Sequence, residues 1–152
     1  MTTTVSTPGT TTITMSVNDA IIWCAGFFEA AGRIQVVRPS QSSTRSLVIT
    51  INKQSQWTLN RFRENVGGGS VMPIRGTGRQ TLWRWQSTGF VAGEFLQRML
   101  PWIVTKREQV LLAIELANTV DPSRRKVSDE ILVRREEIEN ELRAIRNESR
   151  YR

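Results

Sequence analysis

The sequence has little of what several common classes of protein require. It contains no histidine and a single cysteine, Cys24. One cysteine cannot form an internal disulfide bond, and a structural zinc site needs more Cys and His ligands than this chain supplies. The longest apolar run, residues 20–28, covers only nine residues, far short of a membrane span. We therefore expect a protein without a zinc site, an internal disulfide or a transmembrane helix.

The start of the chain, MTTTVSTPGTTTITMS, lacks the basic region and the apolar core of a secretory signal peptide. It is rich in threonine, and we expect residues 1–15 to form a disordered tail. The rest is long enough for one folded domain, since 39% of the 152 residues are hydrophobic. We expect an intracellular protein of the cytoplasm or nucleoid, and an organellar or phage-encoded origin is compatible with the same observations.

Acidic residues are nearly missing from the middle of the chain. Between Ala30 and Gly93, nine basic residues accompany a single acid, Glu64. Over the whole chain arginine outnumbers lysine by 18 to 3, and the guanidinium of arginine forks onto phosphate or onto the O6 and N7 atoms of guanine. An ordinary solvated basic face is the alternative, but such faces usually mix charges of both signs. The distribution favours a polyanionic partner.

The periodicity of the sequence predicts the order of the secondary-structure elements. Ser16 and Asp19 have the spacing of a capping box, which predicts a helix that ends at Gly32. The later patterns predict strands at 33–38 and 46–53, a helix at 54–66, strands at 70–75 and 80–88, and helices at 90–100, 106–119 and 128–149. The fold class is therefore α+β, with a domain over 16–120 and a C-terminal helical extension over 121–152.

The two predicted hairpins carry polar and basic side chains on the face opposite their apolar residues. An antiparallel sheet can pack one face on helices and offer the other to a ligand, and a curved sheet of this chemistry fits the major groove of duplex DNA. Single-stranded RNA usually needs aromatic residues on the open face, and a strand pair such as Trp83 and Trp85 is more often core. We expect DNA contacts from Arg33, Gln35, Arg38, Arg45, Ser46, Thr50, Asn52, Arg75, Arg79 and Arg84.

Residues 24–32, CAGFFEAAG, resemble the nine-residue signature of the LAGLIDADG homing endonucleases. The later segment GEFLQRMLPWIVTKREQ resembles the late helix, proline turn and basic residue of the same family. The likeness covers roughly residues 16–119 and implies an αββαββα core whose antiparallel sheet forms a DNA-binding saddle. It also implies binding to a long, near-palindromic double-stranded DNA site and metal-dependent cleavage of both strands, the activity behind intron mobility in that family.

The sequence contains one copy of this signature. Family members with one copy work as homodimers, so the resemblance implies a two-fold symmetric dimer with the signature helices at its centre. Ala25 and Gly26 fall where small residues let the two helix backbones touch, and Glu29 is placed in the same expected interface. The alternative is that residues 20–28 form a buried core helix of a monomer.

The resemblance also implies an active site, and one residue of that site is missing. The acid before the final glycine of the signature holds the divalent metal, Mg²⁺ or another cation, and in this chain that position is Ala31. Glu29 lies two residues earlier, about 200° around the helix, and we do not expect it to substitute. Lys106 matches the basic residue near the scissile phosphates, and Lys53 falls where relatives place a polar residue of the solvent network. We expect metal binding and cleavage to be lost or strongly impaired.

Two functional classes stay open at this point. The first is a homing endonuclease that is inactive in this form, whether Ala31 is natural or engineered. The second is a non-catalytic protein that reuses the fold as a DNA-binding regulator or an intron-RNA maturase.

The C-terminal helix lies beyond most of the resemblance. Its apolar residues Ile131, Ile138, Leu142 and Ile145 form a narrow stripe on an otherwise charged surface. We expect this stripe to dock on its own domain. A short coiled coil with a partner subunit is the alternative.

Overall fold

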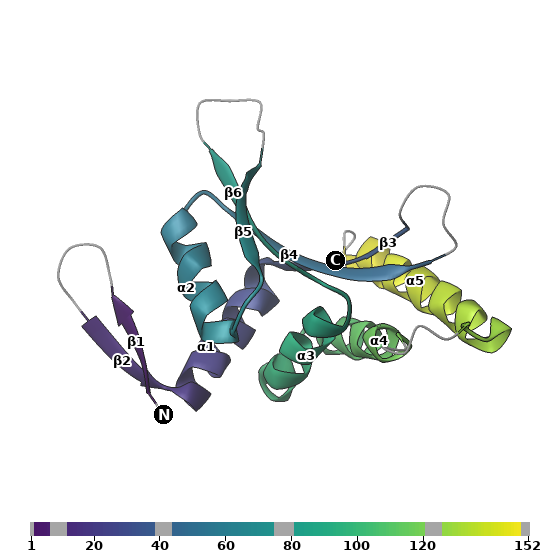
Figure 1. The fold of residues 1–152 in the computed structure, drawn as a ribbon, viewed down its shortest axis with the longest axis horizontal. Coiled ribbons are helices and arrows are strands. Elements are labelled where there is room, and N and C mark those ends of the chain that lie inside the picture. Colours follow the sequence, from purple (N-terminus) through teal and green to yellow (C-terminus); the bar gives the residue numbers. More distant parts are fainter. Residues whose placement is uncertain (1, 7–11, 39–43, 75–80, 121–125, 150–152) are drawn as a thin grey trace.

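The computed structural model describes residues 2–6, 12–38, 44–74, 81–120 and 126–149, and the fold has two layers, with helices against one face of an antiparallel sheet (Figure 1). The strands are β1 (Thr2–Ser6), β2 (Thr12–Ser16), β3 (Gly32–Val37), β4 (Ser46–Lys53), β5 (Ser70–Ile74) and β6 (Leu82–Thr88). The helices are α1 (Val17–Ala31), α2 (Gln56–Val66), α3 (Gly89–Met99), α4 (Arg107–Asn118) and α5 (Asp129–Ser149), with a 3₁₀ turn at Leu100–Trp102. From α1 onward the predicted α+β order is confirmed.

The structure differs from the expectation at the N terminus. In place of a disordered tail it has the antiparallel pair β1–β2, with Thr4 opposite Thr14. Threonine is β-branched and favours strands over helices, and β2 runs directly into α1 at Ser16. The Ser16 side chain accepts a hydrogen bond from the Asp19 backbone N–H at 3.0 Å, so the predicted cap of α1 is present.

The main sheet has four strands in the order β3-β4-β6-β5, and every neighbouring pair is antiparallel. Helices α1 to α4 lie on one side of this bent sheet, and no helix of the described residues lies across the other side (Figure 1). Because side chains alternate along a strand, each strand presents one row of residues to the helices and one row to the open face.

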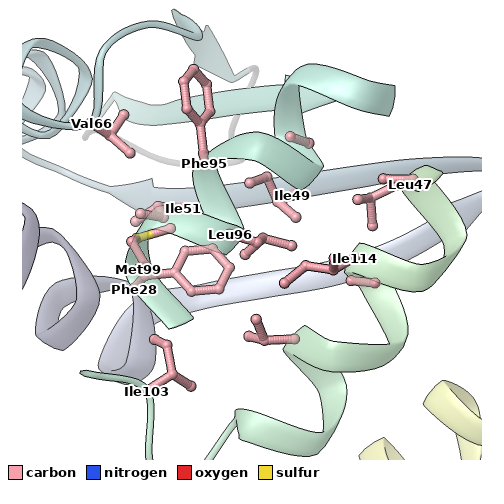
Figure 2. Packing of buried hydrophobic residues seen from close by; sticks show 14 of the residues in the cluster. Phe28, Leu47, Ile49, Ile51, Val66, Phe95, Leu96, Met99, Ile103 and Ile114 are labelled. Atoms are coloured by element: carbon pink, nitrogen blue, oxygen red, sulfur yellow. The ribbon is translucent and has the colours of Figure 1, made fainter. Parts of the chain in front are cut away.

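The core lies between the sheet and the helices. Ile49 and Ile51 of β4 pack with Phe28 of α1 and with Leu96 and Met99 of α3 (Figure 2). Trp85 of β6 is fully buried beside Phe62 of α2, with ring centroids 4.7 Å apart in an edge-to-face arrangement. The prediction that Trp85 belongs to the core is confirmed, and Trp83 packs partly buried against the same cluster.

Two glycines mark places where chain segments come too close for a side chain. A Cβ atom on Gly32, the last residue of the signature segment, would lie 2.4 Å from the ring of Phe28. A Cβ atom on Gly69 would lie 2.3 Å from Trp85 Nε1, and the φ angle of Gly69 is +92°, which favours glycine. These contacts fix the turn from α1 into β3 and the turn from α2 into β5.

Helix α5 docks on its own domain, as expected from its apolar stripe. Ile138 and Leu142 are buried and Ile145 packs against the core. Arg135 donates hydrogen bonds to the side chain and backbone oxygens of Thr119 at 2.9 and 3.0 Å, which ties α5 to the end of α4. No helix among the described residues is long and apolar enough to cross a membrane.

Candidate nucleic-acid interface

Strand register identifies the residues of the open face. Arg33 of β3 lies opposite Thr50 of β4, which lies opposite Gln86 of β6, which lies opposite Ser70 of β5. Alternation from this row gives the whole face as Arg33, Gln35, Val37, Ser46, Val48, Thr50, Asn52, Ser70, Met72, Ile74, Leu82, Arg84, Gln86 and Thr88. Within these described strands the face contains no acidic residue, so its charge is positive.

Most of the residues expected to contact DNA lie on this open face: Arg33, Gln35, Ser46, Thr50, Asn52 and Arg84. Arg38 follows the end of β3 and is exposed. Arg75 and Arg79 lie outside the described residues. The open face also holds residues that were not expected to contact DNA, namely Gln86, Ser70 and the apolar Met72, Ile74 and Leu82. Strict alternation around the buried Trp85 is the signal that would have placed Gln86 and Arg84 together.

Thr50 is an exception on this face. It is only 4% exposed, because it occupies a central strand between the longer side chains of Arg33 and Gln86. Its hydroxyl group is therefore less accessible than the neighbouring arginine and glutamine groups. The expectation that Thr50 contacts base edges is weakened by its burial.

Arg45 was expected on the DNA-binding face, and the structure places it elsewhere. Its Nε atom donates a hydrogen bond to the carboxylate of Glu139 on α5. Both side chains are only 11% exposed. Arg45 lies two residues before Leu47, and Leu47 faces the core, so alternation directs Arg45 to the helical side of the sheet. It connects the start of β4 to α5.

Arg84 and Asn52 form a pair on the open face. They lie directly opposite each other on β6 and β4, and Arg84 Nε donates a hydrogen bond to Asn52 Oδ1 at 3.0 Å. Both residues are half-buried. The guanidinium group of Arg84 is therefore held at a fixed place on the surface.

The last turn of α1 carries the position where the resemblance implies a metal ligand. Ala31 is half-buried there and has no donor atom. The carboxylate of Glu29 is turned toward the start of α4, where its Oε1 atom accepts hydrogen bonds from the backbone N–H groups of Val104 at 2.6 Å, Thr105, and Lys106 at 3.2 Å. Desolvation opposes ionisation of this carboxyl group, but these N–H bonds outweigh it and lower the pKa of Glu29.

Lys106 completes the same connection between helices. Its Nζ atom donates a hydrogen bond to the backbone oxygen of Glu29 in the last turn of α1. Partial burial lowers the pKa of Lys106, and the nearby Glu29 carboxylate acts in the opposite direction. Lys53 has a different environment, with its Nζ 5.7 Å from the centroid of the Phe27 ring. Glu29 and Lys106 thus fix the end of α1 against the start of α4.

A cleft of about 240 Å³ opens next to Lys106, between β3, α4 and α5. Its lining residues are Gly32, Arg33, Ile34, Gln35, Lys106, Gln109, Leu142 and Arg146. Three of them are cationic and none is acidic, so the cleft has a positive potential suited to phosphate oxygens.

The donor atoms at this place do not fit a divalent cation. Magnesium and calcium ions take oxygen ligands, chiefly carboxylates, and Ala31 supplies none. The Oε1 atom of Glu29 is already bound by three backbone N–H groups. In the described part of the chain, no three His, Cys, Asp or Glu residues are grouped closely enough to hold a metal ion.

One face of α1 is left free by the described part of the chain. Ile22, Gly26 and Ala30, four residues apart, are all exposed, and Ile22 is 39% exposed. A Cβ atom on Gly26 would meet nothing within 4 Å among the described residues, so the fold of one chain does not require glycine there. Ala25, by contrast, is fully buried in its own core, and Glu29 binds the start of α4. Of the three residues expected at the dimer interface, only Gly26 therefore lies on the free face of α1.

No family model and no curated protein matches this sequence. Solved structures do match. The homing endonuclease I-CvuI in complex with its target aligns with a TM-score of 0.69 at 19% identity, over 83% of this chain and 81% of that chain. The archaeal intron-encoded homing endonuclease I-Vdi141I, complexed with DNA, aligns with a TM-score of 0.68 at 20% identity, over 84% of each chain.

Another similar structure has a longer chain, and this protein matches a smaller share of it. The I-SmaMI LAGLIDADG homing endonuclease, bound to cleaved DNA, aligns with a TM-score of 0.61 at 16% identity, over 78% of this chain but 42% of that chain. The chain therefore spans about four-fifths of I-CvuI and less than half of I-SmaMI. At these identities the comparison shows the fold, and the chain has the fold of the LAGLIDADG homing endonucleases.

Proposed function

We propose that this chain binds a specific double-stranded DNA site as a homodimer of the homing endonuclease type, and that Ala31 leaves it without metal-dependent cleavage. The observation that carries the proposal is the open face of the β3–β6 sheet, which presents Arg33, Arg84 and polar side chains beside some apolar ones and has no acid within its described strands. Antiparallel sheets of this kind can enter the major groove. The neighbours I-CvuI and I-Vdi141I, which share the fold, were solved with DNA.

The free face of α1 supports the dimer. A glycine inside a helix costs about 1 kcal/mol relative to alanine, and nothing within 4 Å of Gly26 accounts for it among the described residues. A second α1 helix packed against Ile22, Gly26 and Ala30 supplies the reason, because small residues let helix backbones approach closely. A two-fold dimer presents two copies of the sheet, so its DNA site is long and near-palindromic.

The donor set at the end of α1 supports the loss of cleavage. Metal-assisted hydrolysis of a phosphodiester needs a carboxylate that fixes the ion, and neither Ala31 nor the engaged Glu29 offers one. Binding does not depend on this carboxylate, because the sheet residues and the cationic cleft at Lys106 supply the DNA contacts. The chain is then a sequence-specific binder that retains the scaffold of a nuclease.

Restoring the carboxylate tests this proposal. The wild-type protein first selects its preferred duplex from a random pool, and that duplex is then incubated with Ala31→Asp protein and Mg²⁺. We expect double-strand cleavage by Ala31→Asp, suppressed by a chelator, and none by wild type. Ala31→Asn, which has the same shape without the charge, is the matched control and should not cleave. Cleavage by the wild type would contradict the assignment of Ala31.

Binding without cleavage by Ala31→Asp has a different meaning. It favours a DNA-binding regulator, the second functional class, because one restored ligand then does not recreate a nuclease site. An intron-RNA maturase is less favoured, since Trp85 is buried and Trp83 lies on the helical side of β6. Preferential binding to structured RNA over duplex DNA would overturn the DNA proposal.

Substitution of Gly26 tests the dimer. In Gly26→Leu the side chain would push two facing α1 helices apart, at about 1–3 kcal/mol for each overpacked site. We expect a monomer by analytical ultracentrifugation and weaker DNA binding. In a monomeric protein the same change would meet open space and raise helix propensity. Asn118→Leu, at an exposed position of α4, is the control and should leave sedimentation unchanged.

A further inference from the structure

We infer that Arg84 recognises a guanine in the major groove and that Asn52 is the positioning residue that holds the Arg84 guanidinium for this contact. The inference rests on the proposed DNA-binding function and names a base and a residue pair within it. It starts from the one described hydrogen bond between two side chains of the open face, which joins Arg84 Nε to Asn52 Oδ1 at 3.0 Å.

Strand pairing holds the two residues in register. Asn52 of β4 and Met72 of β5 lie directly opposite Arg84 on either side of β6. The Arg84 side chain therefore stands between an amide and a thioether, and both of its neighbours belong to paired strands. These neighbours limit the directions that the guanidinium group can take. The direction that remains open is outward from the sheet, toward a ligand.

The hydrogen bond also determines which atoms remain for a ligand. A guanidinium nitrogen can only donate, so the Asn52 atom that faces it is the oxygen. With Nε engaged, the two terminal nitrogens of Arg84 still present parallel N–H donors. Guanine offers two acceptors, O6 and N7, at the edge of the major groove, and a forked arginine matches both.

The same bond restricts Asn52 as an independent reader of adenine, because it occupies one of the two lone pairs of Oδ1 and fixes the direction of the amide group. That contact needs the amide oxygen to accept from N6 while the amide nitrogen donates to N7. Here the oxygen already accepts from Arg84. The earlier expectation that Asn52 itself contacts base edges is therefore replaced by a positioning role.

Arg84 also has no competing carboxylate on this face. The described strands place neutral side chains around it, namely Thr50, Asn52, Met72, Ile74, Leu82 and Gln86. A guanidinium paired with a carboxylate would lose donors and charge, whereas a neutral amide leaves its charge intact. Arg33 lies on the same face and is exposed, so it lacks the restraint that makes Arg84 suited to one base.

The test measures base preference at every position of the site. Wild-type, Arg84→Lys, Asn52→Ala and Asn52→Asp proteins each select duplexes from a random pool, and affinities for the four bases are then compared at each position. We expect wild type to prefer guanine at one position in each half-site by about 5- to 150-fold. Arg84→Lys should lose this preference, because lysine keeps the charge but lacks the fork.

The Asn52 variants test positioning. Asn52→Ala should lose part of the guanine preference at the same position and keep its affinity for non-specific DNA. Asn52→Asp keeps an acceptor oxygen for Arg84 Nε, so it should retain more of the guanine preference than Asn52→Ala, while its added negative charge should weaken affinity for every duplex alike. Arg143→Lys on α5, away from the open face, should match wild type, and circular dichroism verifies that each variant is folded.

The possible results distinguish a failure of this inference from a failure of the proposed DNA-binding function. A wild-type protein with no preference for any duplex defeats the proposed function and the inference together. A selective wild type whose preference matrix is unchanged in Arg84→Lys defeats the inference alone, and so does a lost preference for a base other than guanine. An Asn52→Ala protein that keeps full guanine preference shows that Arg84 acts without positioning.

Discussion

The two faces of the β3–β6 sheet are built from alternating residues of the same strands, yet their chemistry differs. In β6, Trp85 is fully buried against the helices, while its neighbours Arg84 and Gln86 lie on the open face. One face therefore carries the packing free energy, and the other carries groups that can bind a ligand. Substitutions on the two faces should separate stability from DNA binding.

The basic residues divide in the same way. Arg33 and Arg45 belong to the same hairpin, and both looked like candidate DNA contacts. The structure places Arg33 on the open face and pairs Arg45 with Glu139 on the helical side. Two arginines of one hairpin thus have different roles. The number of basic residues alone therefore does not define the DNA-binding surface.

The largest expected effect is on the helical face. Trp85→Ala removes a buried indole that contacts Phe62 and donates from Nε1 to the Gly68 oxygen at 2.9 Å. Truncation of a buried tryptophan costs about 3–5 kcal/mol, to be measured by urea unfolding. Trp57→Ala, at a half-buried position of α2, is the control and should cost less. Equal costs would show that the helical face of the sheet does not dominate stability.

Arg45→Ala should have an intermediate effect on stability and little effect on DNA affinity. It breaks a mostly buried ion pair, leaves Glu139 with Arg143 as its remaining partner, and should cost about 1–3 kcal/mol. Thermal unfolding and DNA titration of the same sample provide the two measurements. Weaker DNA binding at unchanged stability would return Arg45 to the DNA-binding surface.

The smallest expected effect on stability is that of Arg33→Ala, below about 0.5 kcal/mol, because the side chain is exposed. DNA binding should weaken in this variant. If Arg33 contacts a phosphate, DNA affinity should fall equally for all sequences, and the slope of log affinity against log salt concentration should become shallower by about 1 for each copy of the residue. If Arg33 contacts a base, the base preference at one position of the site should change. Titration over a range of salt concentrations decides between them. Unchanged binding would remove the open face as the DNA surface.

The signature segment at residues 24–32 predicted the fold correctly and the residues on the free face of α1 only in part. Its likeness to the LAGLIDADG signature predicted the fold, and the element order from α1 onward agrees with the structure. The same nine residues also misled, because Ala25 was expected at the dimer interface and is buried in its own core. Adjacent helical positions point about 100° apart, and a motif does not state which direction faces the core.

The sequence by itself determined the strands and helices from α1 onward, the nearly acid-free middle of the chain and the missing carboxylate at Ala31, because local periodicity and residue identity are written in it. Tertiary structure alone decided which side of the sheet each arginine occupies, that Glu29 binds the start of α4, and that Asn52 holds Arg84. These contacts join residues 32 to 94 positions apart. Their partners are selected by strand register and helix docking, which depend on packing across the whole core.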